Sequence, residues 1–211
     1  MNAGAPAAPG AERWRLFVAV PISPELRRAL ARAVDTLRGT PDLGTLRWTA
    51  VESWHLTLAF LGPTPPDAVP EIAAQLAGVA GRHAPFWASA GGLGAFPVPS
   101  RARVLWLGVC DPDGRLAGLA TDVGDALGLG RTSEFRAHLT LARASAHGSF
   151  RLPRGWSWSG IPAALRGKPA AARLDVDTMV LMRSHLGRGT PHYEPLENFP
   201  LGAAPWVTGR G

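Results

Sequence analysis

Cysteine is nearly absent from this chain, since Cys110 is the only one among 211 residues. One thiol cannot build a disulfide framework or a thiolate-held metal cluster, so we expect a reducing compartment and a cytoplasmic protein. Long apolar runs are also lacking: none approaches the roughly 18 residues of a membrane helix, which predicts no membrane partner. Lysine is limited to Lys168, so arginine carries almost all of the positive charge behind the net value of +6. This balance favours a polyanion, above all nucleic acid, as partner.

The two ends of the chain have the composition of tails. The start, MNAGAPAAPGA, lacks both the basic residues and the apolar core of a signal peptide. We expect a disordered tail over residues 1–12, a single bilobal domain over 13–201 and a flexible tail over 202–211. With 46% apolar residues, the central part is apolar enough to bury a core.

The same order of elements occurs twice along the chain. Residues 15–20 predict a strand, the following segment predicts a helix between Ser23 and Gly39, and residues 54–61 predict a second strand. The second series consists of a strand over 103–109, a helix over 112–127 and a strand over 137–142. We therefore expect an α+β protein in which one unit is used twice, giving two lobes with related sheets.

Signals outside these two series are weaker. A helix is predicted over residues 67–80, and a strand lies within 173–186, with the segment after residue 191 pairing beside it. Residues 147–172, rich in Arg, Trp, Pro and Gly, are predicted to be mostly loop.

The last strand of each series carries the tetrapeptide His-Leu-Thr-Leu, at residues 55–58 and 138–141. Side chains alternate between the faces of a strand, so each histidine shares a face with the threonine two residues later, about 6.5–7 Å away. The leucines share the opposite face and can pack into a core. If both strands line one cleft, two imidazoles and two hydroxyls converge there.

Two opposed imidazoles suit an in-line displacement at phosphorus. Imidazole has a reference pKa near ~6.5, so one ring can remove a proton from water while the other protonates the departing oxygen. The hydroxyls of Thr57 and Thr140 and the guanidinium of Arg143 can bind phosphate oxygens. Arg143 lies five residues after His138, so on an unbroken strand it would point to the opposite face. It reaches the cleft only if the strand has ended or bulged.

Other interpretations of these residues remain open. A single histidine on a strand is usually structural, and threonine is common in strands. Two histidines could also bind a metal ion, but no Asp, Glu or Cys stands at ligand spacing near either copy. A serine nucleophile lacks the G-x-S-x-G pattern. We therefore expect no metal and no cofactor.

The paired motifs HLTLAFLG and HLTLAR resemble those of the 2H phosphoesterase superfamily, and within it the bacterial RNA 2′,3′-cyclic phosphodiesterases, also called 2′-5′ RNA ligases. The segments RLFVAV, RARVLWLGV and LMRSHLGRGTPHYEPLENFPL are similar to further segments of that family, in the same order. The resemblance covers residues 13–201. It leaves 147–172 unaligned and departs at Arg183, where an acidic residue is common in the family.

The resemblance implies a fold, a reaction and two roles. The fold would be bilobal, with two antiparallel sheets related by a pseudo-two-fold axis around a central cleft and helices on the outer faces. The reaction would be metal-independent hydrolysis of an RNA terminal 2′,3′-cyclic phosphate to a 2′-phosphate, with 2′-5′ ligation as its reverse. By the same resemblance His55 would be the proton donor and His138 the proton acceptor. The residues alone do not tell the two histidines apart.

The sequence also suggests aromatic contacts with the substrate, a binding partner and two other possible functions. Phe17, Trp48 and Tyr193 are candidates to stack on a base or line the cleft. The partner would be an RNA end with a 2′,3′-cyclic phosphate, such as a tRNA fragment, bound by a monomer. The alternatives are a phosphodiesterase acting on small cyclic nucleotides or 2′-5′ oligonucleotides, and a non-catalytic nucleotide-binding module.

Overall fold

The computed structural model describes residues 12–41, 43–130, 135–152, 172–185 and 192–202. The two tails expected from the sequence lie outside these ranges except for residues 12 and 202, and so does most of the 147–172 segment. The helices are α1 (Pro24–Arg38), α2 (Val69–Arg82) and α3 (Arg115–Ala126), with the 3-10 turns η1 (Val51–Ser53), η2 (Pro66–Ala68) and η3 (Pro99–Arg101). The strands are β1 (Trp14–Pro21), β2 (Arg47–Trp48), β3 (His55–Thr64), β4 (Phe86–Phe96), β5 (Val104–Cys110), β6 (His138–Arg143), β7 (Arg173–Val176), β8 (Thr178–His185) and β9 (His192–Pro200).

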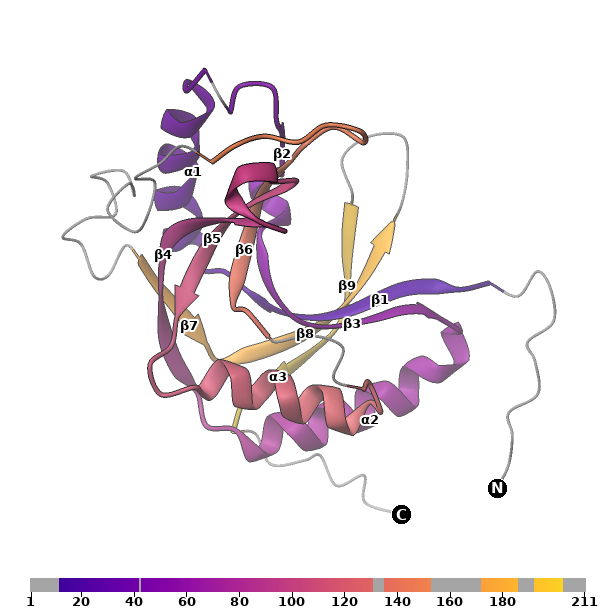
Figure 1. Ribbon diagram of the computed structural model, residues 1–211. Coiled ribbons are helices and arrows are strands. Elements are labelled where there is room, and N and C mark those ends of the chain that lie inside the picture. Colours follow the sequence, from indigo (N-terminus) through magenta and orange to yellow (C-terminus); the bar gives the residue numbers. More distant parts are fainter. Residues whose placement is uncertain (1–11, 42, 131–134, 153–171, 186–191, 203–211) are drawn as a thin grey trace, which may run out of the picture.

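All of the strands in the described ranges belong to one curled antiparallel sheet (Figure 1). Its order is β7-β4-β5-β6-β3-β1-β8-β9, with β2 paired to β6. We call β3, β1, β8 and β9 the first half, and β6, β5, β4, β7 and β2 the second half. The two sheets expected from the sequence are present as these halves. They are joined because the two central strands, β3 and β6, pair through Leu56 and Leu139.

Helix α1 shows how local sequence sets an element. The Ser23 hydroxyl accepts a hydrogen bond from the backbone N–H of Leu26 at 3.2 Å, Pro24 occupies the first helical position, and Gly39 follows the last. The predicted helix is confirmed. Its buried side chains recur at helical spacing: Leu26, Leu30, Ala33, Val34 and Leu37. None of the helices in the described ranges is long and apolar enough to span a bilayer.

The helices flank the curled sheet. Helices α2 and α3 lie side by side, with α2 in contact with β8 and β9 and α3 in contact with β3, whereas α1 lies at the other end of the sheet (Figure 1). The buried hydrophobic side chains of both halves form one connected cluster, in which Leu56 and Leu139 are fully buried. The leucines of the two His-Leu-Thr-Leu copies therefore anchor both strands in a shared core.

Strand β4 has no counterpart among the strands predicted from the sequence. It contains Gly91, Gly92 and Gly94, and glycine is depleted in strands, so the sequence pattern did not indicate it. Gly94 is required by packing, because a Cβ there would overlap the six-membered ring of Trp106 on the neighbouring strand β5. The glycine lets the indole lie against the β4 backbone.

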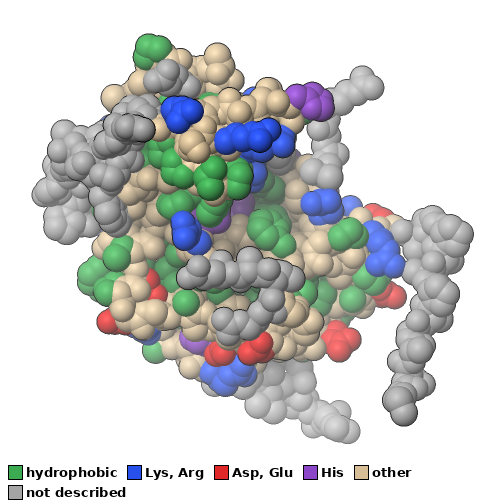
Figure 2. All heavy atoms as spheres, viewed as in Figure 1, with side chains coloured by type: hydrophobic (Ala, Val, Ile, Leu, Met, Phe, Trp, Pro, Cys, Tyr) green, Lys and Arg blue, Asp and Glu red, His purple; other side chains and the backbone are tan. Residues whose placement is uncertain are grey.

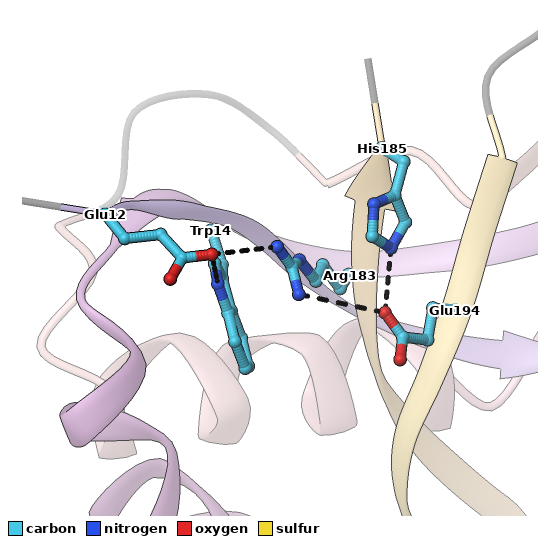
Figure 3. A network of polar contacts seen from close by, with 5 residues as sticks. All are labelled: Glu12, Trp14, Arg183, His185 and Glu194. Atoms are coloured by element: carbon cyan, nitrogen blue, oxygen red, sulfur yellow. Dashed lines mark hydrogen bonds and ion pairs between the residues drawn. The ribbon is translucent and has the colours of Figure 1, made fainter. Parts of the chain in front are cut away.

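Arg183 belongs to a polar network at the edge of the first half (Figure 3). Its guanidinium lies 4.0 Å from the centre of the Trp14 ring and 3.2 Å from the carboxylate of Glu12. On the other side, Glu194 lies 4.0 Å from Arg183 and 2.7 Å from Nε2 of His185. These contacts attach the start of β1 to the β8–β9 hairpin, so Arg183 has a structural environment of its own.

Candidate active site

The two His-Leu-Thr-Leu copies meet at the centre of the sheet. The registered pair Leu56–Leu139 lies between the two motifs, and strand alternation places His55 and Thr57 on the face of β3 opposite to Leu56, and His138 and Thr140 on the face of β6 opposite to Leu139. The charge of His138 acts on the pKa of His55, so the two imidazoles lie near each other. Figure 2 looks into a hollow in which histidine side chains (purple) are bordered by hydrophobic (green) and basic (blue) side chains.

Both imidazoles are oriented by a hydrogen bond to the backbone carbonyl two residues earlier in the chain. Nδ1 of His55 lies 2.8 Å from the carbonyl oxygen of Ser53, and Nδ1 of His138 lies 2.6 Å from that of Arg136. A carbonyl oxygen only accepts hydrogen bonds, so each Nδ1 carries the proton and donates it. In the neutral ring Nε2 is then the unprotonated nitrogen, and in both histidines it is the nitrogen left to exchange protons with a ligand.

Aromatic side chains fix the rings further. His55 lies 4.9 Å from the Phe17 ring and 5.0 Å from the Tyr193 ring, the latter edge to face. His138 lies 5.1 Å from Phe96 and 5.9 Å from Trp106. Each imidazole is thus held between two aromatic rings from its own half of the sheet.

The surroundings lower the pKa of both histidines. Burial lowers the pKa of His55 to about 4, and the positive charges of His138 and Arg143 act in the same direction. Burial is also the largest cause that lowers the pKa of His138, followed by the charges of Arg143 and Arg136. The hydrogen bonds to the carbonyls of Ser53 and Arg136 oppose these shifts. Both rings therefore favour the neutral form more strongly than a free imidazole does.

Arg143 lies on the same face as the histidines because β6 bulges. Trp106 pairs with Thr140, but Leu105 pairs with Ala142, so Leu141 is an extra residue on β6. The bulge shifts the alternation by one: Leu141 and Ala142 are both buried, and Arg143 is exposed. The bulge that Arg143 needs to reach the cleft is therefore present. The effect of its charge on the pKa of both histidines agrees with this placement.

The first half repeats the bulge at the equivalent residue. Ala19 pairs with Thr57, but Val18 pairs with Ala59, which leaves Leu58 as the extra residue on β3. Five residues after His55 the chain therefore returns to the cleft face, as it does five residues after His138. The residue at that position is Phe60, which pairs with Phe17 and is 72% exposed.

Phe60 was not a candidate from the sequence. Aligning HLTLAF with HLTLAR would have shown that Phe60 occupies the position equivalent to Arg143. Its ring lies 6.1 Å from that of Phe17, which in turn contacts His55. Among the large hydrophobic side chains of the described residues Phe60 is the most exposed, ahead of Trp87 and Val98. Phe60 is therefore an aromatic surface available to a planar ligand.

The three aromatic candidates from the sequence have different positions. Phe17 is 3% exposed and lies between His55 and Tyr193, so it braces these rings and offers no surface to a base. Tyr193 is partly exposed and meets His55 edge to face. Trp48 packs against the core from β2, beneath Arg38, and makes no aromatic contact with either histidine.

The donor set does not resemble a metal site. In the parts of the chain that the structure describes, no three His, Cys, Asp or Glu side chains gather as metal ligands. The polar groups that do converge are two imidazoles, two hydroxyls and one guanidinium. Such a set can exchange protons and bind an anion.

Comparison with known proteins identifies relatives along most of the chain. Residues 20–106 match the family described as LigT like Phosphoesterase. A Thermus thermophilus protein named RNA 2′,3′-cyclic phosphodiesterase is 35% identical over 89% of this chain and 90% of its own length. A Geobacillus stearothermophilus protein of the same name is 34% identical over 95% of this chain. The chain spans 62% of that relative's length.

A solved structure extends the similarity to the fold. The crystal structure of a Thermus thermophilus protein superposes with a TM-score of 0.72 at 29% identity, covering 89% of this chain and 98% of that chain. The fold is therefore shared over nearly the whole of that protein.

Proposed function

From the premise that the chain belongs to the LigT-like phosphoesterase family of the 2H superfamily, we propose that it hydrolyses the 2′,3′-cyclic phosphate at an RNA end and leaves a 2′-phosphate. One observation carries the proposal: two imidazoles on one face, each with Nδ1 bound to a backbone carbonyl and Nε2 left for chemistry. The names of the relatives at 34% and 35% identity support the substrate.

In the proposed reaction the phosphorus atom lies between the two histidines. Nε2 of His138 accepts a proton from a water molecule, whose oxygen attacks phosphorus in line with the bond to O3′. That bond breaks, and the protonated Nε2 of His55 gives its proton to O3′. The product has a 2′-phosphate and a 3′-hydroxyl, and the two histidines regain their starting protonation by exchange with solvent.

The pKa shifts fit an anionic substrate. In the free protein burial lowers the pKa of both rings, to about 4 for His55, and this favours their neutral forms at pH 7. The negative charge of the cyclic phosphate favours the protonated form of a neighbouring imidazole, so binding raises the pKa of the proton donor. Substrate binding thereby sets up the acid and base pair.

Three further side chains act on the phosphate. Thr57 and Thr140 lie on the face of the histidines, where their hydroxyls donate hydrogen bonds to non-bridging oxygens. Arg143 donates charge-assisted hydrogen bonds to the same oxygens, and these strengthen as negative charge grows in the transition state.

The base of the terminal nucleotide stacks on Phe60. Aromatic stacking accepts every base, so it suits an enzyme that recognises an RNA end and not a sequence. This contact distinguishes a nucleoside substrate from inorganic or alkyl phosphodiesters.

The reaction uses no metal ion, because both proton transfers are assigned to imidazoles. Run in reverse with a 5′-hydroxyl in place of water, the same groups would join two RNA ends through a 2′-5′ linkage. Water is abundant in an open cleft, so hydrolysis dominates.

The test is an assay of the purified protein, with a chelator present, on an oligoribonucleotide that ends in a 2′,3′-cyclic phosphate. We expect a 2′-phosphate product, which resists a 3′-phosphatase and is released by an unspecific phosphatase. A 3′-phosphate product or loss of activity with the chelator would contradict the mechanism. Tight nucleotide binding without turnover between pH 5 and 9 would instead support a binding module.

A further inference from the structure

The structure contains a cavity of about 190 Å³ beside His55. Its floor is formed by Ala19 and Val180 on the cleft face of β1 and β8, and its walls include His55 and Tyr193. Arg27 from α1 and Glu52 from η1 also line it. Its lining includes Glu52 to His55, at and before the start of β3, whereas Phe60 lies five residues further along that strand, so the cavity and the Phe60 surface lie in opposite directions along the chain from His55.

The cavity exists because the two halves differ at one equivalent pair of positions. Ala19 pairs with Thr57 and Val180 in the first half, and Trp106 pairs with Thr140 and Gly94 in the second. In the second half the indole of Trp106 covers Gly94 and fills this place. In the first half the methyl group of Ala19 leaves it open.

The geometry of a ribose 2′,3′-cyclic phosphate indicates which part of an RNA end would lie near the cavity. In a ribose 2′,3′-cyclic phosphate the base is attached to C1′, next to C2′, and the 5′ chain is attached through C4′, next to C3′. The base and the 5′ chain therefore leave the ribose on opposite sides of its phosphate-bearing edge. With the base on Phe60 and O3′ at His55, the 5′ chain is directed toward the cavity.

We propose that this cavity binds the nucleotide on the 5′ side of the cyclic phosphate, so that the protein acts on RNA ends in preference to mononucleotides. The proposal rests on the proposed function. Arg27 binds the phosphate that links the last two nucleotides, and the sugar and base of the preceding nucleotide occupy the cavity beside Tyr193.

Arg27 is suited to this contact. Its Nη1 donates to the carbonyl oxygen of Val51 at 2.5 Å, which holds the side chain in place and leaves other guanidinium donors for a phosphate. Within the described part of the chain it forms no ion pair, whereas Arg28, the next residue on α1, pairs with Glu25 at 2.7 Å. Arg28 does not line the cavity and is therefore a matched control.

The experiment compares kcat/KM for a mononucleoside 2′,3′-cyclic phosphate with kcat/KM for a dinucleotide that ends in the same cyclic phosphate. We expect the wild type to prefer the dinucleotide by at least about 10-fold, the size of one charge-assisted hydrogen bond. Arg27→Gln should remove most of this preference, and Arg28→Gln should retain it. Ala19→Leu, which fills the cavity, should also lower kcat/KM for the dinucleotide more than for the mononucleotide.

The outcomes separate the two proposals. Equal kcat/KM for both substrates in the wild type would overturn the subsite and leave the proposed function standing. A loss in Arg27→Gln that is the same for both substrates would also overturn it, because a general structural effect does not discriminate between them. No hydrolysis of either substrate would overturn the proposed function and the subsite with it.

Discussion

The two halves of the sheet share a framework and differ in what surrounds it. Each has a histidine whose Nδ1 donates to the carbonyl two residues earlier, and each has a bulge at the last leucine of the motif. After the bulge, however, the first half presents Phe60 and the second presents Arg143. The duplicated part is thus the pair of histidines to which we assign proton transfer, and the two halves differ in the side chains beside them.

The difference extends one strand outward. Ala19 leaves a cavity in the first half, and Trp106 closes the same place in the second. The first half therefore has two surfaces available to a nucleoside, the cavity and the Phe60 ring. The second half has the guanidinium of Arg143 and the packed indole of Trp106. This division is consistent with ribose and base lying on the His55 side and the attacking water on the His138 side.

The largest expected effect on activity comes from removing either histidine of the two motifs. His55→Ala and His138→Ala should each lower kcat by about 10²- to 10⁴-fold, since each removes one proton transfer. His147→Ala, at an exposed position, is the control. Full activity in either variant would refute paired acid-base catalysis.

The two histidines can then be told apart chemically. Replacing the bridging 3′ oxygen by sulfur gives a leaving group that needs no proton. This substrate should restore turnover in His55→Ala and not in His138→Ala, when single-turnover rates are compared. The reverse pattern would exchange the two roles.

Removing the positive charge of Arg143 in the second half should have the next largest effect on activity. Arg143→Gln should lower kcat by about 10²- to 10³-fold, because its hydrogen bonds strengthen in the transition state. The charge of Arg143 lowers the pKa of both histidines, so its loss should raise both pKa values and move the pH profile of kcat/KM to higher pH. The exposed Arg101→Gln should change neither quantity.

Removing the aromatic surface of the first half should affect binding more than chemistry. Stacking contributes about 1–3 kcal/mol per base, so Phe60→Ala should lower kcat/KM by about 5- to 150-fold, mainly through KM. Phe60→Trp should retain activity, and Val98→Ala, at another exposed apolar position, should have no effect. A fall in kcat alone would contradict stacking.

The last prediction concerns stability and not activity. The unfolded chain binds a proton at His55 near pH ~6.5, and the folded protein binds it only near pH 4. Between these values the unfolded state holds more protons, so the free energy of unfolding should fall as pH is lowered from 6.5 to 4, by at most about 1.4 kcal/mol per unit from this group. Urea unfolding of the wild type and His55→Gln should show a weaker pH dependence in the variant. An unchanged dependence would contradict the shift.

Strand alternation was enough to predict the central part of the site. It placed His55 with Thr57 and His138 with Thr140, because these positions depend only on a period of two. It could not place Arg143, since the bulge at Leu141 is defined by the pairing of β6 with β5 and not by the sequence of β6 alone. Phe60 was missed for the same reason.

Features that several segments of the chain build together could not be predicted from the sequence. The cavity joins residues of β1, α1, η1, β8 and β9, and its opening depends on the small size of Ala19. Strand β4 was hidden by three glycines, of which Gly94 makes room for Trp106. In both cases the cause is a contact between residues far apart in the chain.

The single bridge between β3 and β6 has a mechanical consequence. Leu56 and Leu139 lie directly behind the two histidines, and they are the one residue pair that links these strands within the described sheet. Both leucines are fully buried in the core that the two halves share, so this pair fixes how closely the two strands approach each other at the level of the histidines.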